Sequence, residues 1–334
     1  MFHFSRILNC LILCFLLSVE LVSGKEVSKE DLAKERKSLY LKTSALTGVP
    51  WTIIAGCDQY ERNIASFKNA YPAAGKDEVL ISLNFSKKEW TGPLNPDKND
   101  DNPKTIALFG GVGKDGNGDG KARLSDPEDR LFTFSERLTS EGPGPQNYRV
   151  AIWNIYRRGK AVEMIDGYAR LFKAFNTTNL TEHAFPLLIR SGYDYNSTWG
   201  ARRGWGGLRI HEGTDLFAHY GTPVRATSYG IVEMIGWNKY GGWRLGIRDI
   251  QGNYHYYAHL NGYAPHLRKG SITQPGQEIG YVGSSGYGPK GTQGKFPPHL
   301  HYGIYRDNGR SEFSFDPYPY LRAWEAQDRK KGRK

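Results

Sequence analysis

Three short motifs in the second half of the chain carry side chains that can bind metals or move protons. The first is His211-Glu212-Gly213-Thr214-Asp215, the second contains His259, and the third is Pro298-His299-Leu300-His301-Tyr302. In the third motif two imidazoles stand two residues apart, which places both on one face of a strand. In the first, an imidazole and a carboxylate flank a glycine at a separation that a strand entering a turn can bring onto one ion. We therefore expect these groups to share one cleft.

Such a set of side chains fits a catalytic zinc site. Three protein ligands, two nitrogens and one oxygen, leave a fourth position for water, whose pKa the metal lowers toward about 7. Two further imidazoles nearby can move protons and stabilise an oxyanion. The sequence has no HExxH helix motif, so Glu212 is a poor candidate for the general base of that other metalloprotease design. Each histidine alone is more often structural than catalytic, and only the set predicts a site.

Other polar residues near the motifs carry weaker signals. By alternate spacing His255 shares a strand face with His259, whereas His219 and His266 lie in polar turns, and we expect all three to stay outside the site. The pair Arg202-Arg203 could contact a peptide carboxylate or form a solvated turn. The tyrosines around the motifs are expected to pack rather than to contact substrate; they are Tyr254, Tyr256, Tyr257 and Tyr302.

The elements that must position the motifs are strands. Short apolar runs at 230–237, 243–249 and 253–258 alternate with glycine-rich turns, which predicts an antiparallel sheet. We assign 199–310 to this sheet domain, 176–198 to a linker before it, and 311–334 to a basic C-terminal tail.

The region 25–175 is predicted to be a helical domain. Ser28 looks like an N-cap that opens a helix through about Thr43, and Pro50 opens a second helix that reaches Arg62. Helical patterns follow at 130–138 and 147–172. The fold class is therefore multidomain, with a helical part followed by an antiparallel β-sheet part.

A loop between these helices has the spacing of a calcium site. Oxygen ligands stand at positions 1, 3, 5 and 12 of a loop with glycine at position 6, as in an EF-hand; they are Asp115, Asn117, Asp119 and Asp126. Position 12 is Asp rather than Glu, which shortens the bidentate arm. The alternative is a polar Asp/Gly loop that holds no Ca²⁺.

The net charge and the N-terminal sequence restrict the partners and the location expected for the protein. The net charge of +11 favours polyanionic partners such as acidic wall polymers, but the Lys and Arg residues are scattered without a reading motif, so we expect no nucleic-acid partner. Residues 1–24 join Arg6 to a short apolar run, which predicts a signal peptide or an uncleaved anchor, and no later segment is apolar enough to span a bilayer. Cys57 alone lies outside that segment, so there is no disulfide framework, which is typical of an exported bacterial protein.

The ordered motifs, with the flanking segments 199–203, 221–224 and 276–283, resemble the M23 peptidases, the zinc endopeptidases typified by lysostaphin-like wall hydrolases. The resemblance implies a compact antiparallel sheet with a cleft above it and hydrolysis of peptide bonds in peptidoglycan. It implies one zinc ion per chain on the ligands His211, Asp215 and His301. It also implies that His259 and His299 orient or deprotonate the attacking water and stabilise the tetrahedral intermediate. An insert at 287–296 departs from the family pattern and is expected to edge the cleft.

The helical part resembles a lytic transglycosylase with a lysozyme-like fold, in which Glu61 would be the acid and base. Because no glycine-rich groove segment follows, a scaffold that only recognises glycan is the favoured interpretation. The whole arrangement is similar to the sporulation-associated L-Ala-D-Glu endopeptidases of bacilli. That similarity implies cleavage of the L-Ala-D-Glu bond of the stem peptide, in spore cortex maturation, by a secreted or envelope-associated protein of a Gram-positive bacterium. The alternatives are a non-catalytic wall-binding or hydrolase-activating module, and an endopeptidase that cuts the D,D cross-link.

Overall fold

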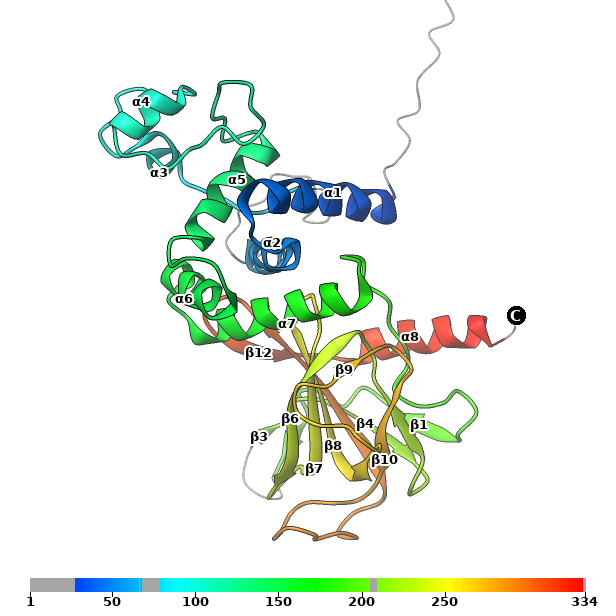
Figure 1. Cartoon of the computed structure of the whole chain (residues 1–334). Helices are drawn as coiled ribbons and strands as arrows, with labels where there is room; N and C mark the ends of the chain where they lie inside the picture. Colours follow the sequence, from blue (N-terminus) through cyan, green and yellow to red (C-terminus); the bar gives the residue numbers. More distant parts are fainter. Residues whose placement is uncertain (1–27, 66, 68–78, 205–208, 333–334) are drawn as a thin grey trace, which may run out of the picture.

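The structure is a computed structural model that describes residues 28–65, 67, 79–204 and 209–332. Helices occupy the first half, and strands followed by a C-terminal helix occupy the second (Figure 1). The predicted signal or anchor at 1–24 lies outside the described residues. Within the described part, no helix combines the length and the apolar character that a membrane span requires. The helices of the first half are α1 (Lys29–Thr47), α2 (Trp51–Ala65), α3 (Lys87–Thr91), α4 (Pro103–Leu108), α5 (Pro127–Leu138), α6 (Pro145–Tyr156) and α7 (Gly159–Phe175).

Local sequence signals set the helix ends. The Ser28 side chain accepts a hydrogen bond from the backbone N–H of Asp31, and acidic residues in the first turn of α1 complement the helix dipole. Gly48 ends α1 with a φ of 73°, a left-handed conformation that glycine adopts without steric cost. The two helices predicted at the start of the helical domain are confirmed, and each runs a few residues further than expected.

Helix α2 lies at the centre of the helical half. At Gly56 an added Cβ would meet the backbone oxygen of Ile165 at 2.9 Å, so glycine allows α2 to pack closely on α7. Next to it, the buried carboxylate of Asp58 accepts hydrogen bonds from Tyr40 Oη (2.7 Å) and from Arg62 Nη2 (2.7 Å). Two backbone N–H groups also donate to it, so a charge in the core is fully bonded.

The second half forms an antiparallel sheet in the order β1-β4-β11-β8-β7-β6-β9, with β10 joining β5 to β8 and β12 added to β11. Two very short strands, β2 and β3, pair with each other beside it. The predicted antiparallel sheet is confirmed. The elements of the second half are β1 (Tyr193–Tyr195), β2 (Arg202–Arg203), β3 (Arg209–Ile210), β4 (Thr214–Ala218), β5 (Pro223–Arg225), β6 (Gly230–Asn238), β7 (Gly242–Arg248), β8 (Asn253–Tyr263), β9 (Ile272–Thr273), β10 (Glu278–Val282), β11 (His299–Asp307), β12 (Glu312–Phe315) and helix α8 (Tyr318–Lys331).

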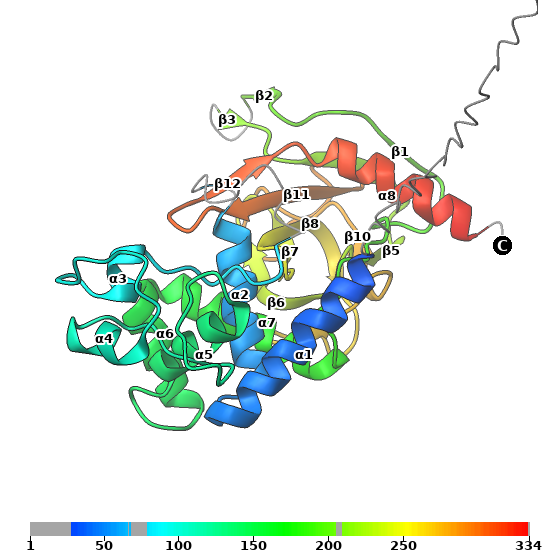
Figure 2. The ribbon, with the colours of Figure 1, turned by 90° about the horizontal axis from the view of Figure 1, so that it is seen from above.

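The segments expected as a linker and as a basic tail are both built into the sheet's core. Phe185 and Leu187, from 176–198, are fully buried there, and β1 pairs with β4. At the other end, α8 buries Leu321 and Trp324 in the same core. Seen from above, α1 to α7 lie on one side and β12 with α8 on the other (Figure 2). Neither segment is a free connector in this structure.

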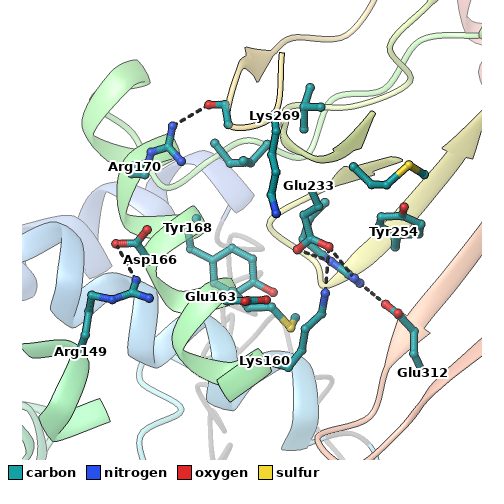
Figure 3. Close-up of a pocket in the computed structure, with 17 residues that line it drawn as sticks. Arg149, Lys160, Glu163, Asp166, Tyr168, Arg170, Glu233, Tyr254, Lys269 and Glu312 are labelled. Carbon is teal, nitrogen blue, oxygen red and sulfur yellow. Dashed lines mark hydrogen bonds and ion pairs between the residues drawn. The ribbon is translucent and has the colours of Figure 1, made fainter. Parts of the chain in front are cut away.

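Helix α7 joins the two halves through charged side chains. Its preceding residue Arg158 makes a two-fold contact with the buried carboxylate of Asp307, at the end of β11 (2.9 and 2.5 Å). Lys160 of α7 pairs with Glu233 at 2.8 Å, and Arg248 binds the same carboxylate at 3.0 Å (Figure 3). Lys160, Glu233 and Arg248 line a cavity of about 520 Å³ between helix and sheet. The strand that carries two of the motif histidines is thus tied to the helical half.

We predict that Asp307→Asn destabilises the whole protein, because it leaves the guanidinium of Arg158 without its charged partner in a largely buried place. Loss of one partner of such a pair costs about 3 kcal/mol or more in the free energy of unfolding. Urea denaturation followed by circular dichroism measures it. Glu30→Gln is the matched control, because the Glu30–Lys34 pair is about two-thirds exposed and should contribute less than about 1 kcal/mol. Equal effects of the two substitutions would contradict the prediction.

Candidate active site

Strand β11 places its two histidines on the open face of the sheet. It lies between β4 and β8, and its register sets His301 directly opposite Asp215 on β4. The alternate residues Leu300 and Tyr302 are fully buried on the other face, as their spacing predicts. His211 lies just before β4, where its backbone N–H donates to the carbonyl of Ala201. The sheet thus brings the first and third motifs together.

Three donor atoms converge at this point. His211 Nε2 lies 2.9 Å from His301 Nδ1 and 3.1 Å from Asp215 Oδ1, and the last two atoms are 2.9 Å apart. Ligand bonds of about 2.0–2.1 Å put neighbouring corners of a zinc tetrahedron about 3.3 Å apart, close to these separations. The His211 Nδ1–H donates to the carbonyl oxygen of Thr198 (2.9 Å), so its Nε2 presents a lone pair to the centre. The three residues can therefore hold a metal ion.

The charges at this point favour an ionised carboxylate. In the metal-free protein, burial alone would raise the pKa of Asp215, but the hydrogen bonds that His211 and His301 donate when their facing ring nitrogens carry a proton outweigh it and hold that pKa well below its usual range. Gly213 is required between these residues, because an added Cβ would lie 2.7 Å from the His301 ring and 2.6 Å from the Tyr302 carbonyl oxygen. The glycine that separates the two ligands in the motif thus makes room for the third.

His259 and His299 lie beside the three donors. Their ring centroids are 4.8 Å apart, and His299 Nε2 is 3.9 Å from Asp215 Oδ1. In each ring Nδ1–H donates to a backbone carbonyl, that of Ser285 for His259 and that of Pro297 for His299, both at 2.8 Å. The lone pair is therefore on Nε2 in the neutral form of both rings.

Burial lowers the pKa of His259 to about 3, and the imidazoles of His299 and His301 act in the same direction. His259 is therefore neutral at physiological pH. A neutral imidazole whose charged form is disfavoured can accept a proton only transiently and returns it readily.

A β-bulge turns His259 toward the site. Its φ is 62°, in the left-handed region, and the pairing of β8 with β7 shifts register between Trp243 and Leu245. The expectation that His255 shares a strand face with His259 is therefore wrong. His255 is buried in the core, where it contacts Asp249 Oδ2 (3.0 Å) and Tyr302 Oη (2.7 Å).

Beside the donors lies a cavity of about 150 Å³ with aromatic walls. Tyr256, expected only to pack, lines it, and its ring is 5.9 Å from that of His301. The insert 287–296 supplies Tyr287 to the wall, and Phe296 packs on the His259 ring at 4.7 Å. Sequence reasoning missed Arg209 and Tyr240, which also line the cavity. Proximity in the chain could have indicated Arg209, two residues before a motif histidine, but nothing in the sequence distinguishes Tyr240.

The two candidate sites of the helical half lie apart from this cavity. Glu61 is on α2, half-buried near Tyr156, where burial first and then the Glu61 charge raise the pKa of that phenol. In the predicted calcium loop, both carboxylate oxygens of Asp115 accept backbone N–H groups, and Asp119 pairs with Arg123. Asp126 caps α5 and also accepts from the Asn117 amide. These bonds occur with either interpretation of the loop, so the calcium site stays a prediction.

Fold and site together define a metal-dependent hydrolase built on an antiparallel sheet. Residues 209–313 match the model of peptidase family M23. The chain is 54% identical over 325 residues to the L-Ala–D-Glu endopeptidase of Bacillus subtilis strain 168, covering 97% of this chain and 98% of that protein. It is 34% identical over 116 residues to lysostaphin of Staphylococcus simulans, covering 34% of this chain and 22% of that one. The crystallised catalytic domain of that lysostaphin aligns with a TM-score of 0.32 at 32% identity, over 39% of this chain and 92% of that domain. This chain belongs to peptidase family M23, and it is an endopeptidase.

We predict that Gly213→Ala reduces metal binding at least tenfold, because the new methyl group displaces the His301 ring from the other two donors. Metal content per chain after dialysis, together with competition against a chelator, measures the loss. Gly262→Ala is the matched control in the same sheet, since an added Cβ there meets nothing within 4 Å. Metal retention by the Gly213 variant equal to that of the control would contradict the prediction.

The depressed pKa of His259 gives a pH dependence of stability in the metal-free protein. The unfolded state takes up a proton as pH falls below about 6.5, whereas folded His259 does so only near about 3. The contribution of His259 to the free energy of unfolding is thus fully present above pH 6.5 and is lost as pH falls. The loss between pH 7 and pH 5 is about 2 kcal/mol. Urea denaturation at several pH values should show a shallower slope for His259→Gln than for the parent protein. Parallel slopes would exclude this role of His259.

Proposed function

We propose that the protein is a zinc-dependent endopeptidase that hydrolyses the bond between L-Ala and D-Glu in the stem peptides of peptidoglycan. The observation that carries the metal chemistry is the convergence of three donor atoms within 2.9–3.1 Å beside two further imidazoles. The choice of bond is supported by the activity for which the Bacillus subtilis relative is named, since that relative matches 97% of this chain.

The residues that would hold the metal are His211 through Nε2, Asp215 through Oδ1 and His301 through Nδ1. A bound zinc ion supplies Lewis acidity, which activates water and polarises the scissile carbonyl. Two nitrogens and one carboxylate oxygen suit zinc, and the carbonyl of Thr198 fixes the tautomer of His211.

The other two histidines divide the proton handling. His259 Nε2 accepts a proton from the attacking water, and since burial disfavours the imidazolium, the proton passes on to the leaving nitrogen. His299 can donate to an oxyanion only when it carries a proton on Nε2, because its Nδ1–H is bound to the Pro297 carbonyl.

The remaining parts of the chain are assigned more broadly. We propose that the helical part, residues 25–175, binds glycan on a lysozyme-like scaffold, and that 199–310 is the peptidase domain. The lack of a glycine-rich groove segment after Glu61 in the sequence supports binding over glycan cleavage. Export to the envelope of a Gram-positive bacterium and a role in spore cortex maturation belong to the same proposal. They are supported by the net charge of +11, suited to acidic wall polymers, and by the match to the Bacillus subtilis protein.

We predict that His211→Ala and His301→Ala each lower hydrolysis of purified peptidoglycan by at least a thousandfold, because each removes one of three ligands. Mass spectrometry of the released muropeptides should show new D-Glu amino termini and no new glycosidic ends. His219→Ala, which changes an exposed histidine directly after β4, is the matched control and should retain activity.

Undiminished hydrolysis after removal of the metal with a chelator would overturn the zinc proposal. Products cut at the D,D cross-link would instead support the alternative endopeptidase. Binding to the wall without any new amino terminus would support the non-catalytic module.

A further inference from the structure

The cavity between α7 and the sheet contains none of the metal-binding residues in its lining. Its volume of about 520 Å³ is in the range of cavities that hold small ligands, and it lies where two folded parts meet, a frequent place for such sites. Side chains of β6 and of the adjoining ends of β7 and β8 form one wall, and α7 forms the other (Figure 3). The charges on these walls indicate which ligand the cavity fits.

Most of the carboxylates on the walls are already neutralised. Asp166, Glu233 and Glu312 each lie within ion-pair distance of a lysine or an arginine of the same cavity. Among the described residues, by contrast, the cations Arg170 and Lys269 pair with no carboxylate. The cavity therefore has a place where positive charge is not compensated, and an anionic group of a ligand would be attracted to it.

Arg170 and Lys269 come together from different elements. Arg170, on α7, donates a hydrogen bond from Nη2 to the carbonyl oxygen of Gly270 (2.6 Å), the residue that follows Lys269. This bond to a neutral oxygen holds the guanidinium beside the turn before β9 without cancelling its charge. Lys269 leaves that turn and extends into the cavity (Figure 3). A carboxylate between the two side chains could accept charge-assisted hydrogen bonds from both.

This cavity and the metal-binding residues lie on the same face of the sheet. Tyr254 lines the cavity, and Tyr256 lines the smaller one beside the donor atoms. Ala258 lies directly opposite His301, and by the alternation along β8 it shares a face with both tyrosines. The Tyr305 ring lies against both of them, with centroids 6.2 Å and 6.4 Å away. Four residues of strand, about 13 Å, separate Tyr254 from Ala258.

A peptide on this face would reach both places. An extended peptide covers about 13 Å with four residues, so a group about four residues from the scissile bond would lie in the cavity. The terminal carboxylate of a peptide is always on the amine side of a bond cut within it. We propose that Arg170 and Lys269 bind the terminal carboxylate of the substrate peptide, about four residues beyond the scissile bond. This inference rests on the proposed function, since it takes the stem peptide as the substrate.

A phosphate-rich wall polymer is the other anion that two cations could bind. Glu163 disfavours it, because this carboxylate lines the same cavity and, among the described residues, pairs with no cation. Glu163 stands seven residues before Arg170 on α7, about 10 Å along the helix. A polymer with a charge on every unit would meet this carboxylate, whereas a peptide with one terminal charge would not. The face shared with the donor atoms also favours the peptide.

Two synthetic peptides test the inference. Both contain the L-Ala–D-Glu bond and end four residues after L-Ala, one in a free carboxylate and the other in a carboxamide. With the zinc-loaded full chain, we expect kcat/KM to be about tenfold higher for the carboxylate peptide, with the difference in KM, as for a charge-assisted pair in an open cavity. In Lys269→Gln this ratio should fall below about 3, and Lys269→Arg should keep it. Arg268→Gln is the matched control, because it changes the exposed neighbour that does not line the cavity.

A second pair of peptides, two residues shorter, separates this site from general attraction to a basic protein. Their terminal group would end about 7 Å short of the cavity, so the preference for the carboxylate should disappear. An equal preference in the short and long pairs would overturn the inference. Equal kcat/KM values of the parent protein for the two long peptides would also overturn it, while leaving L-Ala–D-Glu cleavage intact.

Binding of inorganic polyphosphate tests the other anion. Weaker polyphosphate binding by Lys269→Gln, with an unchanged ratio for the two long peptides, would overturn the peptide assignment and identify a polyanion site instead. Cleavage of neither long peptide would overturn the proposed function itself, and this inference with it.

Discussion

The site depends on one cross-strand pair, His301 on β11 opposite Asp215 on β4. Antiparallel register fixes their separation without any loop, so two of the three donor atoms belong to the most rigid part of the sheet. His211, at the entrance to β4, completes the set because Gly213 leaves room for the His301 ring. The buried Asp215 keeps its charge only because both imidazoles face it. Three electron-rich donor atoms this close together repel one another when no proton or cation lies between them. A metal cation at the centre would remove that repulsion.

Much of the site could be predicted because it follows from spacing along regular strands. The two-residue separation in His299-Leu300-His301 is enough to place both rings on one face, and the buried Leu300 agrees. His259 shows the limit, since a bulge with a positive φ reverses the alternation that would have paired it with His255. The residue type at this position does not indicate the bulge. Histidine adopts the left-handed region at a cost of about 1 kcal/mol, so its presence gives no reason to expect a positive φ.

Contacts between segments far apart in the sequence could not be predicted from local sequence patterns. The helices α1 and α2 could be predicted from caps and from Pro50, and the sheet from its apolar runs. The place of α8 could not, because its charged C-terminal residues mask the two side chains, Leu321 and Trp324, that pack on the sheet. Arg209 became a cavity residue only when the insert carrying Tyr287 and the turn carrying Tyr240 were brought beside it.

The bond between Arg158 and Asp307 bears on how modular the chain is. In this chain β11 ends on a buried carboxylate whose countercharge comes from the helical half, and Ile231 and Ile250 belong to the core of that half. Removal of the helical half would leave the Asp307 carboxylate without its countercharge. It would also expose the apolar side chains of Ile231 and Ile250. The two halves therefore depend on each other for stability. Replacing the helical half with another wall-binding module would require these charged and apolar contacts to be redesigned first.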